Sequence, residues 1–159
     1  MDDFHIRPIE PRDVERAVGI VTRHDETDGD KAKEFFSAYF GDSDRFPYPG
    51  RHYVLETDDD LVAVGGYVRA RETQEHWIGF LFVDPYYQGQ GIGTHLLKRI
   101  VGDLRKEKIK HLYVTVDEED IPLQTVRFYE VNGFHEAAGK RDPFFPPGAK
   151  GKVYEKALR

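Results

Sequence analysis

The sequence predicts one mixed α/β domain over residues 1–159. Segments in which apolar and polar residues alternate, as in half-buried strands, are interleaved with segments whose apolar residues recur at helical spacing. Hydrophobic residues make up 39% and charged residues 33% of the chain, which is typical of a folded globular protein. No internal repeat, low-complexity tract or linker divides the 159 residues into parts.

The order of the expected elements follows from these patterns. Strands are expected at residues 4–9, 52–57, 61–71, 75–83, 111–116, 133–138 and 151–158. A helix is expected from Pro11, then the polar stretch 24–30 as a break, then a second helical segment. Residues 41–50 are expected to form a loop, and the acidic turn 58–60 to close a hairpin. Two more helices are expected, one after the glycines at 89–93 and one over 122–132, ended by Gly133.

The composition excludes several classes of function. Acidic residues outnumber basic ones by 29 to 23, and the net charge of −6 argues against a nucleic-acid partner. The chain has no cysteine, which excludes disulfides, thiolate metal sites and cysteine nucleophiles. The N-terminus has no signal-peptide pattern, and no apolar run approaches the roughly 18 residues of a membrane span. We therefore expect a cytoplasmic protein with no metal and no membrane partner.

The stretch YYQGQGIGTHLLKRI, from Tyr86 to Ile100, places three glycines directly before an amphipathic helix pattern. Such glycines let successive amides turn toward a phosphate, and the positive end of the helix dipole favours the same ligand. A P-loop is excluded, because no lysine follows the glycines at the required position. A dinucleotide fold is disfavoured, because five residues separate Val83 from Gly89 and the spacing is G-x-G-x-G. A simple flexible turn is the remaining alternative.

The order Val-Asp-Pro (83–85), a short loop, Gln-Gly-Gln-Gly-Ile-Gly (88–93) and a helix resembles the acyl-CoA signature of the general N-acetyltransferase (GNAT) superfamily. In that motif, written [QR]-x-x-G-x-[GA], the defining positions are taken by Gln88, Gly91 and Gly93. The resemblance implies that acetyl-CoA is the cosubstrate. Its pyrophosphate is expected to bind the backbone of residues Gln88, Gly89, Gln90, Gly91, Ile92, Gly93 and Thr94.

A second segment, RFYEVNGF (127–134), resembles the late helix-to-strand segment of the same family. In relatives the tyrosine of this segment lies beside the thioester sulfur, so the resemblance implies that Tyr129 is the general acid that protonates the departing CoA thiolate. Phe128 and Thr125 are expected to contact the cofactor. Many relatives carry an asparagine and an alanine where this chain has Pro122 and Thr125. The contact made by that asparagine is therefore not expected here.

The resemblance also implies a GNAT fold. This is a central, mixed and mostly antiparallel sheet of about seven strands, splayed between strands 4 and 5 and flanked by about four helices. In this chain the splayed strands are 75–83 and 111–116. The pantetheine arm is expected in the gap, paired with backbone groups of Leu81, Phe82 and Val83 like an added strand. An amine would attack the acetyl group directly, without a covalent enzyme intermediate.

A base or a water chain must remove a proton from the attacking amine. If strand 75–83 alternates regularly, Glu75 points to the same side as Val83 and His76 to the other side. Glu75 is then the expected base, acting through water. Asp117 and Glu119, which follow the neighbouring strand, are alternatives, and a solvated surface charge is the more common role of each.

The acceptor pocket is expected between the first two helices and the loop before the last strand. The loop aromatics Phe46, Tyr48, Phe144 and Phe145 would form an aromatic mouth that suits an ammonium group. The aromatic stripe of the second helix, which comprises Phe35, Phe36, Tyr39 and Phe40, is expected in the core. The acidic segments 58–60 and 117–120 would attract a polyamine or a basic peptide.

The expected function is transfer of an acetyl group from acetyl-CoA to a primary amine, which is a small molecule, a polyamine or a protein N-terminal amine. The alternative from another class is a GNAT domain without catalysis that binds acyl-CoA as a sensor or interaction module. The resemblance further implies a homodimer as a common arrangement, and no nucleic-acid partner is expected.

Overall fold

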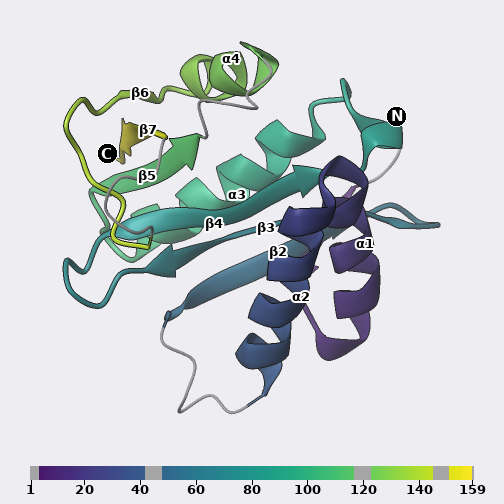
Figure 1. The fold of residues 1–159 in the computed structure, drawn as a ribbon. Coiled ribbons are helices and arrows are strands. Elements are labelled where there is room, and N and C mark those ends of the chain that lie inside the picture. Colours follow the sequence, from purple (N-terminus) through teal and green to yellow (C-terminus); the bar gives the residue numbers. More distant parts are fainter. Residues whose placement is uncertain (1–3, 42–47, 117–122, 145–150, 159) are drawn as a thin grey trace.

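The computed structural model describes residues 4–41, 48–116, 123–144 and 151–158. They include a seven-stranded sheet with the strand order β1-β2-β3-β4-β5-β7-β6. The strands are β1 (His5–Pro8), β2 (Gly50–Glu56), β3 (Leu61–Arg69), β4 (His76–Val83), β5 (His111–Val116), β6 (His135–Glu136) and β7 (Lys152–Ala157). Strands β4 and β5 run parallel, and the other neighbours are antiparallel (Figure 1). The predicted mixed, mostly antiparallel sheet is confirmed.

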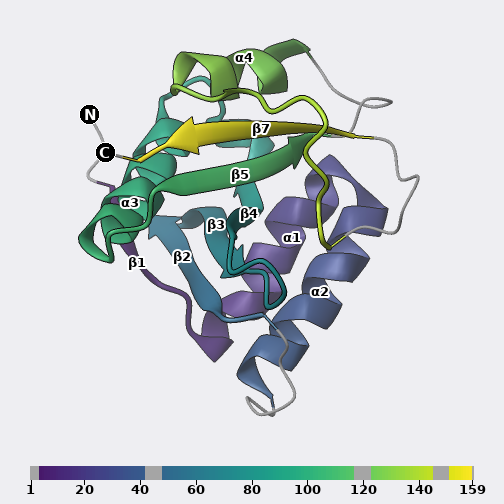
Figure 2. The same ribbon diagram turned by 90° about the vertical axis from the view of Figure 1, so that its left-hand side faces the viewer.

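Helices cover both faces of this sheet. The α-helices are α1 (Val14–His24), α2 (Glu26–Phe40), α3 (Ile92–Lys106) and α4 (Leu123–Val131). Figure 2 shows α3 on one side of the sheet and the α1–α2 pair on the other. The apolar face of α3 is fully buried because its residues recur at helical spacing, as Ile92, Leu96, Leu97, Ile100, Val101 and Leu104 do. The helix after the glycines is therefore confirmed.

The junction of α1 and α2 differs from the prediction. Residues 24–30 were expected to form a polar break, but α2 already begins at Glu26 and only Asp25 lies between the two helices. Asp25 has an extended backbone, and its carboxylate accepts a hydrogen bond from the amide of Asp28 at 3.0 Å. This is an N-cap, and the acidic residues after it are stabilised by the positive end of the helix. The polar composition of this stretch thus starts a helix instead of interrupting one.

The aromatic stripe of α2 surrounds a buried histidine. His52 on β2 is only 1% exposed. Its ring contacts the rings of Phe35, Phe36 and Tyr39, with centroids 4.9, 5.8 and 5.1 Å away. Phe36 is fully buried, whereas Phe35, Tyr39 and Phe40 are partly buried against the same cluster. The expected core role of this stripe is confirmed.

Candidate active site

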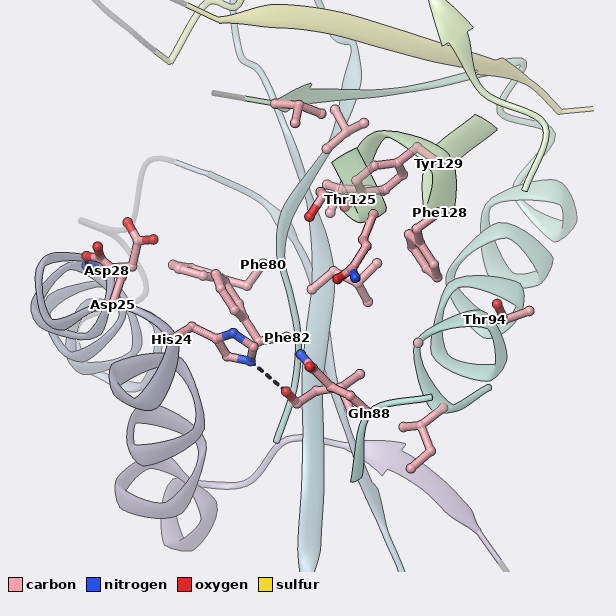
Figure 3. A pocket seen from close by; sticks show the side chains of 18 of the residues that line it. His24, Asp25, Asp28, Phe80, Phe82, Gln88, Thr94, Thr125, Phe128 and Tyr129 are labelled. Carbon is pink, nitrogen blue, oxygen red and sulfur yellow. Dashed lines mark hydrogen bonds between the residues drawn. The ribbon is translucent and has the colours of Figure 1, made fainter. Parts of the chain in front are cut away.

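Strands β4 and β5 separate along most of their length. They pair at only two positions, His76 with Leu112 and Trp77 with Tyr113. Beyond Trp77 the two strands enclose a cleft with a volume of about 1050 Å³. Its walls also include the glycine loop, helix α4 and the start of α2 (Figure 3). The predicted splay between strands 4 and 5 is therefore confirmed, and it opens a passage through the sheet.

A β-bulge at Gly79 sets the direction of the side chains along β4. Gly66 of β3 pairs with Phe80 and the next residue, Tyr67, pairs with Ile78, so Gly79 is an extra residue in β4. After the bulge the side chains alternate between the two faces of the sheet. Leu81 packs against the cluster that includes α3, and Phe80 packs against the cluster that includes α1 and α2. A Cβ at Gly79 would lie in ordinary contact with Val68 and His52, 3.5 and 3.6 Å from their nearest atoms.

The bulge corrects the expectation for Glu75. Trp77 belongs to the cluster that includes Phe35 of α2, whereas Val83 packs with the α3 cluster. Because the extra residue inverts the alternation, Glu75 lies on the side of Trp77, and the prediction that it shares the side of Val83 was wrong. Glu75 forms an ion pair with Lys140 and does not line the described part of the cleft. The alternative carboxylates Asp117 and Glu119 lie outside the described residues.

The edge of β4 over Leu81–Val83 faces the cleft. The amide of Asp84 donates to Val62 O at 2.8 Å, so the peptide groups of Asp84 and, two residues back, Phe82 are directed to β3. Those of Leu81 and Val83 are directed the opposite way, where β5 pairs with neither. All three residues line the cleft, as expected. The alternation leaves the backbone of Leu81 and the amide of Val83 for a ligand, whereas the carbonyl oxygen of Val83 lies 2.6 Å from His24 Nε2.

The three glycines of the loop have two different structural roles. Gly89 and Gly91 have φ values of +82° and +77°, in the left-handed region that side chains disfavour. The φ angle of Gly93 lies outside this left-handed region, but a Cβ on Gly93 would lie 3.2 Å from Phe128 Cε1. The first two glycines therefore permit the turn, and the third permits close packing of α3 against α4.

The turn ends at the N-terminus of α3, where Gly91 is the N-cap residue. The amide of His95 donates to Gly91 O at 3.1 Å, and the amides of Ile92, Gly93 and Thr94 precede it at the positions that a helix leaves without internal acceptors. Of the predicted loop residues, the cleft is lined by Gln88, Gly89, Gly91, Ile92, Gly93 and Thr94, and Gln90 is not among the lining residues. This end of the cleft is thus suited to an anion.

Asp84 anchors the segment that leads into the loop. Its side chain is 1% exposed and accepts hydrogen bonds from Arg23 at 2.9 and 3.0 Å and from Arg16 at 3.2 Å. It also accepts the amide of Tyr86 at 3.0 Å, which caps the 3-10 turn before the glycines. The aspartate of the Val-Asp-Pro segment therefore fixes the loop to α1.

Helix α4 brings the other predicted residues to the cleft. Thr125, Phe128 and Tyr129 all line it, as expected from the second motif (Figure 3). The ring of Tyr129 packs against Phe128 and Phe134, with centroids 5.1 and 5.3 Å away. Burial raises the pKa of the phenol, so Tyr129 stays protonated and can donate. Pro122, the other departure from the family pattern, lies outside the described residues.

The first two helices were expected beside the acceptor pocket, but the residues that form this opposite wall of the cleft were not predicted. His24, Asp25, Thr27, Asp28 and Lys31 line it from the α1–α2 junction. His24 Nε2 lies 2.6 Å from the carbonyl oxygen of Val83. The signal that could have found this wall is the N-cap pattern of Asp25 with acidic residues in the turn after it.

The residues expected to form the acceptor pocket lie elsewhere. Tyr48 and Phe144 contact each other at a centroid distance of 4.9 Å, and Phe144 also contacts Trp77. Neither lines the described part of the cleft, and Phe46 and Phe145 lie outside the described residues. Asp60 is paired with Arg16 at 2.9 Å, so one carboxylate of the acidic turn already has a cationic partner.

Neither a metal cluster nor a membrane-spanning helix is found in the described part of the chain. Over these ranges no three His, Cys, Asp or Glu side chains are grouped so that they could hold a metal ion. The same ranges contain no helix that combines the length and the apolar character needed to cross a bilayer.

The splay between β4 and β5 and the glycine turn agree with the family resemblance of the sequence. Residues 19–134 match the model of the Acetyltransferase (GNAT) family, and the chain belongs to that family. It is 28% identical over 148 residues to the N-alpha-acetyltransferase RimI of Mycobacterium tuberculosis, covering 79% of this chain and 91% of that protein.

Two further similarities support this assignment. The spermine/spermidine N(1)-acetyltransferase of Bacillus subtilis is 34% identical over 59 residues, which are 36% of this chain and only 38% of that protein's length. The crystal structure of the ribosomal-protein-S18-alanine N-acetyltransferase of Escherichia coli has a TM-score of 0.71 at 21% identity, covering 98% of this chain and 94% of that chain. The structural likeness shows the fold.

Proposed function

We propose that this protein is an acetyl-CoA-dependent N-acetyltransferase that acts on a primary amine. The observation that carries the proposal is the single cleft that joins three features. An anion site at the N-terminus of α3, an unpaired strand edge at Leu81 and Val83, and the phenol of Tyr129 all lie along it. Acetyl-CoA carries a pyrophosphate, a pantetheine arm with amides and a thioester in this order, so each part would meet one of these three features.

The protein's own groups would hold such a cosubstrate without a metal. The amides of Ile92, Gly93 and Thr94 would donate to phosphate oxygens, and the dipole of α3 favours their charge. The backbone of Leu81 and the amide of Val83, whose carbonyl already meets His24, would pair with the amides of the pantetheine arm. Phe128 and Thr125 form part of the wall beside that arm.

The reaction requires one bond to form and one to break. The amine nitrogen, after losing a proton, attacks the thioester carbonyl carbon, and the carbon–sulfur bond breaks with its electron pair on sulfur. Tyr129 donates its hydroxyl proton to that sulfur. The nitrogen carries an extra proton after the attack and releases it to solvent, from which the phenol regains a proton. The raised pKa of the phenol keeps this proton in place until the thiolate is formed. The products are the acetamide and free CoA.

The acceptor would approach from the wall formed by the α1–α2 junction. This wall lies across the cleft from Tyr129 and carries the carboxylates of Asp25 and Asp28 (Figure 3). Lys31 also lines the cleft. Two carboxylates favour a cationic amine. The relatives include a spermine/spermidine N(1)-acetyltransferase and an N-alpha-acetyltransferase, which supports polyamines and protein N-terminal amines as the classes to test first.

Two measurements test the proposal. Acetyl-CoA should raise the melting temperature of the protein, whereas NAD should not. Release of free thiol from acetyl-CoA should then depend on an added amine, in a panel that includes spermidine and a peptide with an N-terminal alanine. A stabilising effect of acetyl-CoA without transfer to any amine would favour the acyl-CoA-binding module instead.

A further inference from the structure

The imidazole of His24 is held in one tautomer. His24 is the last residue of α1, and its Nε2 lies 2.6 Å from the carbonyl oxygen of Val83. A carbonyl oxygen only accepts hydrogen bonds, so Nε2 must carry the proton. In the neutral ring Nδ1 is then the unprotonated nitrogen. The ring is also packed against Phe82, with centroids 5.5 Å apart, which fixes its place on the cleft wall (Figure 3).

Nδ1 of this ring is available for a proton. Within the described ranges, Nδ1 makes no hydrogen bond, and His24 is exposed and lines the cleft. Taking up a proton at Nδ1 leaves the bond from Nε2 to Val83 unchanged. His24 can therefore gain and lose a proton without losing its position, which is what a base in a catalytic cycle requires.

The other titratable groups near the cleft are less suited to this role. Glu75 precedes β4, before the bulge at Gly79, and is ion-paired with Lys140. The carboxylate of Asp25 accepts the amide of Asp28 as the cap of α2. The phenol of Tyr129 stays protonated and can only donate.

We propose that His24 is the general base that accepts the proton of the acceptor ammonium at Nδ1. This step rests on the proposed function, because it supplies the neutral amine that attacks the thioester. The ammonium loses one proton to Nδ1, which gives an imidazolium and an amine with a free electron pair. The imidazolium then returns its proton to solvent, so the base is restored after each turnover.

The charged groups around His24 favour this exchange. From α2 the carboxylates of Asp25 and Asp28 and the ammonium of Lys31 line the same part of the cleft, and the phenol of Tyr87 lines it from the turn after β4. On α1 itself, the guanidinium of Arg23 is engaged with the buried carboxylate of Asp84. The two carboxylates favour an ammonium beside the ring and stabilise the imidazolium after transfer.

The kinetic test compares three variants, with spermidine and a peptide that begins with alanine as acceptor probes. His24→Gln keeps an N–H donor for Val83 O but has no base, and we expect kcat/KM to fall on the order of 10²-fold near neutral pH. Its affinity for CoA and its melting temperature should match the wild type. The acidic limb of the pH profile of kcat/KM should disappear, and added imidazole should restore activity to His24→Ala. Glu75→Gln serves as the comparison, because Glu75 is the base expected from the sequence but is ion-paired with Lys140 outside the lining of the cleft.

The outcomes separate this role from the proposed function. If wild-type protein acetylates neither probe nor any other amine, the proposed function fails. If the wild type transfers acetyl groups and His24→Gln does so at the same rate with the same pH profile, only the role of His24 is overturned. Loss of the acidic limb in Glu75→Gln instead of His24→Gln would assign the base to Glu75.

A measurement without any acceptor tests the tautomer itself. In nitrogen-15 NMR spectra of histidine-labelled protein, neutral His24 should show a protonated Nε2 and an unprotonated Nδ1, with His24→Gln used for assignment. A protonated Nδ1 in the neutral ring would overturn the proposal, because that nitrogen could not then accept the proton of an amine.

Discussion

Gly93 and Phe128 are in contact where α3 meets α4, and a Cβ on Gly93 would lie 3.2 Å from Phe128 Cε1. This spacing is tighter than an ordinary contact, so a side chain at Gly93 displaces either the ring or the start of α3. The first turn of α3 is further linked to α4 by Asn132, whose Nδ2 lies 2.8 Å from Phe128 O and 3.5 Å from Thr94 Oγ1. Gly93, the third glycine of the loop, therefore allows the anion site at the start of α3 to pack closely against α4, the helix that carries Tyr129.

Gly93→Val should destabilise the fold and weaken CoA binding. Overpacking against Phe128 is expected to lower the free energy of unfolding by about 1–3 kcal/mol. The displaced amides should also reduce the affinity for CoA several-fold. Urea unfolding and calorimetric titration measure the two effects. Gly102→Val is the matched control, because Gly102 lies on the same helix and a Cβ there meets nothing within 4 Å. Equal effects at both positions would refute the packing role of Gly93.

Tyr129→Phe should separate catalysis from binding. The substitution removes only the hydroxyl, which makes no hydrogen bond within the described ranges, so the stability and the affinity for CoA should change little. We expect kcat to fall about tenfold or more, because the thiolate loses its proton donor. Steady-state kinetics with acetyl-CoA and the most active amine measure this. Tyr113→Phe, on β5 outside the lining of the cleft, is the control. An unchanged kcat in Tyr129→Phe would exclude the phenol as the general acid.

Asp84→Asn should loosen the glycine loop. The carboxylate is 1% exposed and accepts hydrogen bonds from Arg16 and Arg23, whose side chains are 38% and 54% exposed, so the substitution removes the charge of a buried acceptor. The expected loss of stability is about 1.5–3 kcal/mol, with a parallel loss of CoA affinity. Asp60→Asn provides the comparison, because Asp60 also pairs with Arg16 but is 36% exposed, and its loss should have an effect of about 1 kcal/mol or less. The free energy of unfolding from urea titration distinguishes the two, and similar values would contradict the anchoring role.

His52 should make the fold less stable in acid. Burial without a hydrogen-bond partner lowers the pKa of its imidazole to about 3, from an ordinary value of 6.5. Between these values the unfolded chain binds a proton that the folded chain does not, so stability falls as the pH falls through this window. The slope is about 1.4 kcal/mol per pH unit for one group. In His52→Leu the unfolding free energy should depend less on pH between about 6 and 4, and His111→Gln, on an exposed position, should keep the wild-type slope. The same slope in His52→Leu would contradict this assignment.

Features with a local cause were predictable from the sequence. The helix after the glycines follows from periodicity, and the splay between β4 and β5 and the places of Gly91, Thr125 and Tyr129 along the cleft follow from two motifs. The side of Glu75 was not predictable, because one inserted residue at Gly79 inverts the alternation and a bulge has no periodic signature.

The acceptor wall was only partly predictable, because the N-cap pattern at Asp25 is local whereas the contact of His24 with Val83 is not. The stretch after His24 is rich in acidic residues and resembles a loop, but Asp25 caps a helix and holds the junction beside Val83. That proximity joins α1 to β4 across 59 residues of sequence, and no local pattern reports it. The contacts of Phe35 and Phe36 with His52 are equally non-local.

A crystal structure of the complex with CoA tests the central claim most directly. We expect the diphosphate at the amides of residues 92–94 and the pantetheine arm against the backbone of Leu81 and the amide of Val83. We also expect the sulfur within hydrogen-bonding distance of the Tyr129 hydroxyl, on the far side of the cleft from His24. CoA bound away from the gap between β4 and β5, or with its sulfur out of reach of Tyr129, would refute the proposed function.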